Sequence, residues 1–361
     1  MTGGCHDSPF DHPELEFSHT RLRMLFAAAF LLPGIRIFKY ADANPFIRES
    51  GMNPFNKRLV ISFVLFCLAA SPLLAESQAE TTLSFEPGSG EKQFGVSVGQ
   101  EGPNIGPMSV LTSGEGVVVL DAIHHRLIRL DGRGTFNGTI PLPAGQYRDI
   151  TRSGNGGIWL VEANSRSVMR VAGGGIRRVF DVPRQEGFPR QLDYLLITRK
   201  HLVIMDYSDN HLYFFTPAGT VERRVEVSAA LGFALDQNNR ICFLGLTQGG
   251  DSELDLYNRL VRIAEDGSCE EKVLSGPSFE GARLLGFSQT GKPVVLGIAS
   301  QDPFKRELFL VNADGTHELI DTITQRLLFA TRYGHCSGNT LWVNISPMSG
   351  RKILFRRYEL K

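Results

Sequence analysis

The sequence predicts an all-β fold: a six-bladed β-propeller with four-stranded blades, its ring closed by an N-terminal strand. Short apolar runs alternate with turn signals from about residue 81 to the C-terminus, which is the spacing of strands and tight turns. Glycines at corresponding turns, positions 134, 175, 219, 267 and 315, are 41, 44, 48 and 48 residues apart. A period of roughly 40 to 50 residues with four short strands is typical of one propeller blade.

Composition places the chain among ordinary globular proteins. Of its 361 residues, 42% are hydrophobic and 21% are charged, enough to bury a large core. Lysine and arginine total 38, and aspartate and glutamate also total 38. Because no net charge attracts polyanions, we expect no nucleic-acid partner and no electrostatic binding to anionic membranes.

Residues 52–79 predict a secretory signal peptide. A basic segment at 53–58 precedes a twelve-residue apolar run at 59–70. As a helix this run would be about 18 Å long, too short for a hydrocarbon core of ~30 Å. Cleavage is expected after Ala75 or, with small residues at 77 and 79, after Ala79. The protein is then exported, periplasmic or extracellular, with no stable membrane span after cleavage; a retained anchor is the alternative.

Residues 1–51 precede this signal, which has its own methionine, Met52. We interpret them as an extension from a start codon assigned too early, or as disordered. The competing interpretation is that residues 21–38 form a first signal or anchor helix. In either case the folded domain is expected to be 80–361.

The blades follow one another along the chain. The clearest copy runs from Gly106 to Gly134, with apolar runs at 117–121 and 126–130. The second has runs at 158–162 and 167–171, and the third at 201–206 and 211–215. Two longer copies lead to the turns at 267 and 315.

A sixth copy, with runs at 339–344 and 352–358, reaches the C-terminus without room for its outermost strand. Residues 82–86 or 93–98 are candidates to supply it, because circular closure removes an exposed sheet edge. The alternative, a two-sheet sandwich, does not account for a repeat at a constant period.

In the clearest copy of the repeat, apolar residues and an aspartate are followed by a polar turn and an Arg-apolar-x-x-apolar run, as in 119–121 and 126–130. This pattern resembles the NHL repeat family. The second blade has Glu162 at the acidic position, and the third has Asp206 but His211 in place of the arginine. The resemblance covers roughly residues 100–220, since the later blades have Gly245, Gly297 and Asn344 at the acidic position.

The repeated acidic residue is interpreted as structural. Asp121, Glu162 and Asp206 each end a second strand, where a side-chain oxygen can accept backbone hydrogen bonds in the turn that follows. Their recurrence is therefore expected to reflect the blade architecture and not catalysis.

The candidate ligand-binding residues lie near the start of each blade's innermost strand, at the rim of the predicted channel. They are Arg148, Arg190, Arg283, Arg326, Asp149 and Asp193. Guanidinium groups that converge at a channel mouth favour carboxylate or phosphate ligands through bidentate contacts. The alternative is that the arginines are solvated or paired with the neighbouring acids.

Six-bladed propellers related to the NHL family include gluconolactonase-like hydrolases and peptidyl-hydroxyglycine lyases, which hold a metal at the channel. That resemblance implies a metal-dependent hydrolase or lyase as the alternative function. A metal needs several converging ligands, and only Asp149 and Asp193 are carboxylates here. We therefore predict no cofactor and no metal ligand, and leave a channel-bound divalent cation open.

The leading functional prediction is a binding or scaffold module for a protein, a peptide or a small anionic ligand. No nucleophile elbow, zinc-protease helix or phosphate-binding loop is found in the sequence. Cys242, Cys269 and Cys336 remain after signal removal. Because Cys242 and Cys269 should lie two strand spacings apart, roughly 9 to 10 Å, we expect no disulfide between them.

Overall fold

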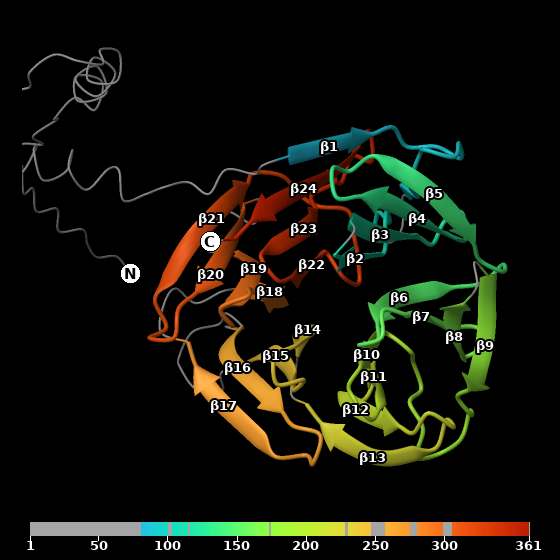
Figure 1. The fold of residues 1–361 in the computed structure, drawn as a ribbon, viewed down its shortest axis with the longest axis vertical. Coiled ribbons are helices and arrows are strands. Elements are labelled where there is room, and N and C mark those ends of the chain that lie inside the picture. The colour runs from blue at the N-terminus through green and yellow to red at the C-terminus, as the bar shows by residue number, and fades with distance from the viewer. Residues whose placement is uncertain are drawn as a thin grey trace, which may run out of the picture. The chain divides into compact units, whose positions relative to one another are not determined.

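The computed structural model describes residues 81–99, 103–114, 116–172, 175–227, 230–246, 257–274, 280–298 and 305–360. Within these ranges the regular elements are 24 strands, in six four-stranded antiparallel sheets around a central axis (Figure 1). This is the predicted six-bladed β-propeller. The proposed extension and signal peptide lie outside the described residues. Among the described residues there is no helix long and apolar enough to cross a membrane.

Each of the first five sheets is built from four strands consecutive in sequence. Blade one contains β2 (Ser109–Ser113), β3 (Gly116–Asp121), β4 (Arg126–Asp131) and β5 (Phe136–Pro141). Blade two contains β6 (Tyr147–Arg152), β7 (Ile158–Glu162), β8 (Ser167–Ala172) and β9 (Gly175–Asp181). Blade three contains β10 (Tyr194–Ile197), β11 (Leu202–Asp206), β12 (His211–Phe215) and β13 (Val221–Glu226).

The later blades follow the same order. Blade four contains β14 (Leu231–Leu235), β15 (Ile241–Leu246), β16 (Tyr257–Ile263) and β17 (Cys269–Val273). Blade five contains β18 (Glu280–Phe287), β19 (Pro293–Ile298), β20 (Arg306–Val311) and β21 (His317–Ile323). Blade six contains β22 (Gly334–Ser337), β23 (Thr340–Asn344) and β24 (Ile353–Glu359), with β1 (Thr81–Phe85) beside β24.

The outermost strand of blade six is thus the first strand of the described chain. β1 runs antiparallel to β24, with Leu83 opposite Phe355. Of the two candidate segments, 82–86 overlaps this strand, whereas 93–98 forms only isolated bridges such as that between Ser97 and Ile105. With β1 in place the sixth sheet has four strands like the others.

The core lies between neighbouring sheets. The middle strand β3 is buried along its whole length, because it packs on both faces, whereas the outer strand β13 alternates between half-buried and exposed residues. Between blades six and one, Val119 packs with Trp342 and Phe355. Between blades two and three, Val161 packs with Tyr213. Each sheet therefore covers the apolar face of its neighbour.

The repeated acidic residue ties its turn to the segment that leads into the blade. Asp206 accepts hydrogen bonds from the backbone N–H of Ser208 at 2.8 Å and of Gln191 at 3.1 Å. Glu162 does the same with Asn164 at 3.0 Å and Gln146 at 2.6 Å. These bonds confirm the structural interpretation.

The innermost strands approach one another closely at the axis. Gly232 in β14 has φ +70°, and a Cβ atom there would lie 2.7 Å from both the backbone N and O of Leu284 in β18. Glycine is required at such a position by both its conformation and its lack of a side chain. The described cysteines are free thiols, and β16 lies between the strands of Cys242 and Cys269, as expected.

Candidate functional site

A buried ion pair lies at the propeller axis. Asp149 of β6 is 0% exposed, and its Oδ2 lies 2.8 Å from Nη2 of Arg332, which is 4% exposed. The same carboxylate accepts hydrogen bonds from Ser109 Oγ at 2.7 Å and from the backbone N–H of Leu195 at 2.9 Å. Both oxygens of Asp149 are therefore used within the protein.

The guanidinium of Arg332 completes this network. It donates to the backbone oxygens of Leu195 at 3.1 Å and Phe233 at 3.3 Å, and lies 4.2 Å from the ring centroid of Tyr194. Burial, the largest single effect, lowers the pKa of Arg332. The charge of Asp149 and the hydrogen bonds to it act in the opposite direction together with Tyr194 and Tyr207, so the net pKa of Arg332 is raised and its guanidinium stays charged. Contacts from one ion pair thereby join blades one, two, three, four and six.

Two pockets lie on either side of the ion pair along the innermost strands. The first, of about 200 Å³, is near the start of these strands and is called the mouth pocket; it is lined by Arg148, Asp193, Tyr207, Arg283, Phe329 and Thr331. The second, of about 170 Å³, is near their ends and is called the far pocket; its lining includes Arg152, Leu235, Arg332, His335 and Cys336. Along the chain, Asp149 lies between Arg148 of the mouth pocket and Arg152 of the far pocket. Arg332 likewise lies between Thr331 of the mouth pocket and His335 of the far pocket. The ion pair therefore separates the two pockets along the axis.

The mouth pocket holds two arginines with unused hydrogen-bonding capacity. Within the described part of the chain, the guanidinium groups of Arg148 and Arg283 form no hydrogen bond and no ion pair. Arg283 instead lies 5.0 Å from the ring centroid of Tyr333. Five N–H donors in a planar fork suit a carboxylate or phosphate group. The pocket therefore presents donors for an anion at its wall.

Asp193 is the carboxylate of this pocket. Burial raises its pKa, with a further contribution from the charge of Asp206, while the backbone N–H of Tyr207 and the charge of Arg148 act in the opposite direction. Its Oδ2 accepts a hydrogen bond from the N–H of Tyr207 at 3.0 Å. Since its protonated form is favoured relative to a free aspartate, Asp193 opposes an incoming anion less than an ordinary carboxylate would.

Three of the six expected rim residues, Arg148, Arg283 and Asp193, thus meet in one pocket. Asp149 is instead a buried member of the axial network. Arg190 is exposed and lines a different pocket between blades two and three. Arg326 is exposed on the connection before blade six, where its backbone oxygen accepts a hydrogen bond from the N–H of Met348 at 2.7 Å.

The axial arginine of blade six is Arg332, which the sequence analysis did not single out. The innermost strand of this blade begins at Gly334, several residues later than the position of Arg326 had suggested. Tyr207 was also missed, although it directly follows the repeated acidic residue Asp206. Arg332 lies two residues before β22, so only the correct strand start would have pointed to it.

Histidines and acids do not gather into a ligand cluster in the residues that the structure describes. These contain no group of three or more histidine, cysteine, aspartate or glutamate side chains that could hold a metal ion. His124 instead pairs with the acidic turn residue, its Nδ1 lying 3.0 Å from Asp121 Oδ2.

The chain matches no protein-family model and no curated protein sequence. Among solved structures, it is similar to a protein of unknown function from Bacteroides thetaiotaomicron VPI-5482, with a TM-score of 0.53 at 11% identity over 77% of this chain and 76% of that one. Virginiamycin B lyase from Staphylococcus aureus aligns with a TM-score of 0.48 at 14% identity, over 78% of this chain and 99% of that one. A luciferin-regenerating enzyme aligns with a TM-score of 0.46 at 11% identity, over 70% of this chain and 91% of that one. At these identities the likeness concerns the fold alone, and it is the first of the three that supports the propeller architecture.

Proposed function

We propose that this protein is an exported β-propeller that binds a small ligand or peptide through a carboxylate group held in the mouth pocket. The observation that carries the proposal is the pair of guanidinium groups, Arg148 and Arg283, that line one half-buried pocket without hydrogen-bond acceptors among the described residues. An arginine partly removed from water gains more from a charge-assisted bidentate contact than one on the open surface.

The size of the pocket restricts the ligand. A volume of about 200 Å³ is below the usual range of roughly 300–1,000 Å³ for pockets that enclose a drug-sized molecule. It suits one carboxylate-bearing group, such as an acidic side chain or the C-terminus of a peptide, with the rest of the ligand outside. Phe329 supplies an apolar wall for the carbon atoms next to the carboxylate.

The test is calorimetric titration of succinate and of a short peptide with a free C-terminus into the purified full-length chain. We expect the double variant Arg148→Ala/Arg283→Ala to lose the binding, and Arg133→Ala to retain it, because Arg133 is an exposed cation in the β4–β5 turn. Arg283→Lys keeps the charge but loses the planar fork, so it should give intermediate affinity. Equal affinity in the wild type and the double variant would contradict the proposal.

The alternative is a metal-dependent hydrolase or lyase with its site at the same channel, as the resemblance to the NHL family implies. A stoichiometric divalent metal in the purified protein, together with an activity that chelation removes, would favour this alternative. Export is tested separately by sequencing the N-terminus of the mature protein. We expect it to begin at Glu76 or Glu80, and a mature chain that retains the residues before Met52 would contradict the proposed signal.

A further inference from the structure

A third pocket, of about 650 Å³, lies between blades two and three and shares no lining residue with the mouth pocket. We call it the interblade pocket. Its charged lining residues are Arg166, Arg184, Arg190, Arg224, Glu186 and Asp209. Four arginines against two carboxylates leave this lining with a net charge of +2.

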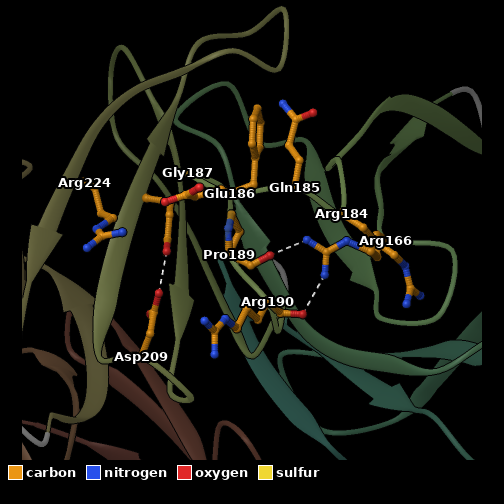
Figure 2. Close-up of a pocket in the computed structure, with 11 residues that line it drawn as sticks. Arg166, Arg184, Gln185, Glu186, Gly187, Pro189, Arg190, Asp209 and Arg224 are labelled. Atoms are coloured by element: carbon orange, nitrogen blue, oxygen red, sulfur yellow. Dashed lines mark hydrogen bonds between the residues drawn. The ribbon is translucent and has the colours of Figure 1, made fainter.

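One wall of the pocket is the connection between β9 and β10, and the side chain of a buried arginine forms hydrogen bonds with both of its ends. Arg166, in the β7–β8 turn, is 5% exposed. Its guanidinium donates to the backbone oxygens of Val182 at 3.0 Å and Pro183 at 3.1 Å. It also donates to those of Arg190 at 2.6 Å and Pro189, as Figure 2 shows. All four acceptors are carbonyl groups of the wall itself.

The neighbouring blade holds the same wall from its other side. Asp206 of β11 accepts hydrogen bonds from the backbone N–H groups of Arg190 and Gln191. The peptide groups around Arg190 are thus fixed by a cation from blade two and an anion from blade three. A wall held in this way loses little conformational entropy when a ligand binds.

Arg166 adopts a backbone conformation that arginine rarely takes. Its φ is +56°, and the equivalent turn residues of blades one and three are His125 at +48° and Asn210 at +56°. Asparagine and histidine are enriched in this left-handed region, whereas arginine is not. The arginine at this position is explained by the four carbonyl groups that its side chain reaches.

Two other arginines of the pocket are left with unused donors. Arg190 and Arg224 are exposed, and no hydrogen-bond acceptor for either guanidinium lies among the described residues. Figure 2 shows both on the side of the pocket where Asp209 lies. Asp209 forms no ion pair with either arginine. Its oxygens accept from the Tyr213 hydroxyl and from the backbone N–H of His211, and Oδ1 lies 3.5 Å from Nδ1 of His211.

We propose that the interblade pocket is a second binding site, which takes a small molecule carrying a carboxylate or phosphate group between Arg190 and Arg224. The guanidinium groups of Arg190 and Arg224 favour an oxyanion, since each can bind such a ligand through paired N–H donors. The wall beside them is already fixed by its hydrogen bonds to Arg166 and Asp206. The volume lies within the usual range for small-molecule pockets. This site is independent of the mouth pocket.

The experiment is calorimetric titration of citrate, and in a separate arm of inorganic phosphate, into the purified full-length chain at low ionic strength. We expect saturable binding that is about ten-fold weaker in Arg190→Ala and in Arg224→Ala. The control Arg177→Ala removes an exposed cation from β9 that does not line the pocket, and it should leave the affinity unchanged. Binding of citrate alone identifies a carboxylate ligand, of phosphate alone a phosphate ligand, and of both a general oxyanion site.

Measurement in the Arg148→Ala/Arg283→Ala variant separates this proposal from the proposed function. Binding that persists there and is weakened by Arg190→Ala supports the interblade site. Binding that disappears in that variant but survives Arg190→Ala and Arg224→Ala belongs to the mouth pocket and overturns the present proposal. The absence of saturable binding with both probes, or an equal loss in Arg177→Ala, overturns it as well.

Discussion

Removing one partner of the axial ion pair is expected to destabilise the propeller strongly. Arg332→Met leaves the carboxylate of Asp149 buried, without its cation, and leaves the backbone oxygens of Leu195 and Phe233 without their donor. Breaking a buried ion pair in this way costs about 3–5 kcal/mol of unfolding free energy. For a domain of this size the midpoint of thermal unfolding should fall by roughly 10 °C.

Urea denaturation of the wild type and of three variants measures this effect. Arg178→Ala is the control, since Arg178 and Asp181 form an ion pair in which both side chains are at least half exposed, and its loss should cost less than about 1 kcal/mol. The double variant Asp149→Asn/Arg332→Met should be more stable than Arg332→Met alone, because no unpaired charge remains buried. If Arg332→Met were as stable as Arg178→Ala, the pair would not be desolvated and our account of the axis would fail.

Three further perturbations address the far pocket, the turns and the axis. Burial, with Arg332 and Arg152 nearby, lowers the pKa of His335 to about 3, whereas a histidine in the unfolded chain titrates near about 6.5. Between these values the unfolded chain therefore binds more protons than the folded one, so the free energy of unfolding falls as the pH falls below about 6.5. His335→Gln should reduce the loss of unfolding free energy that urea denaturation shows between pH 7.5 and 5. An unchanged pH dependence would exclude His335 as its source. Glu162→Ala removes an acceptor of three backbone N–H groups and should lower the free energy of unfolding by about 1–3 kcal/mol in the same assay. The control Glu186→Ala changes an exposed side chain and should leave the stability unchanged. Equal stability of the two variants would argue against the role of Glu162 in the turn. Gly232→Ala places a methyl group 2.7 Å from the backbone of β18 in a left-handed conformation and should lower the midpoint of thermal unfolding, whereas Gly175→Ala, which meets no atom within 4 Å, should not; a stable Gly232→Ala protein would show that β14 and β18 can move apart.

Local pattern was sufficient for the blades and their turns. Alternating apolar runs and turn glycines predicted the hairpins because, within blades one to five, each strand pairs with the next one along the chain, so its register depends on nearby residues. The role of Asp121, Glu162 and Asp206 was also predictable, since their oxygens bond to residues two to three positions further on. The expected strand order likewise kept Cys242 apart from Cys269.

The channel residues were predicted only in part. Arg148, Asp193 and Arg283 follow clear turn signals and do line the mouth pocket. The sequence predicts that the innermost strand of blade six begins near Arg326, whereas it begins at Gly334. Arg332, which occupies the axis, is separated by 183 residues from its partner Asp149.

The sequence by itself therefore determined the number of blades, because each repeat has the same run of strands and turns, and the turn role of the repeated acid, because that role depends on residues two or three positions away. Only the tertiary structure decided that Asp149 and Arg332 divide the axis, and that Arg190 belongs to a pocket between blades. The physical reason is that these side chains meet across blades, where the offset between neighbouring sheets sets the distances. That offset results from the packing of whole sheets, and no local periodicity encodes it.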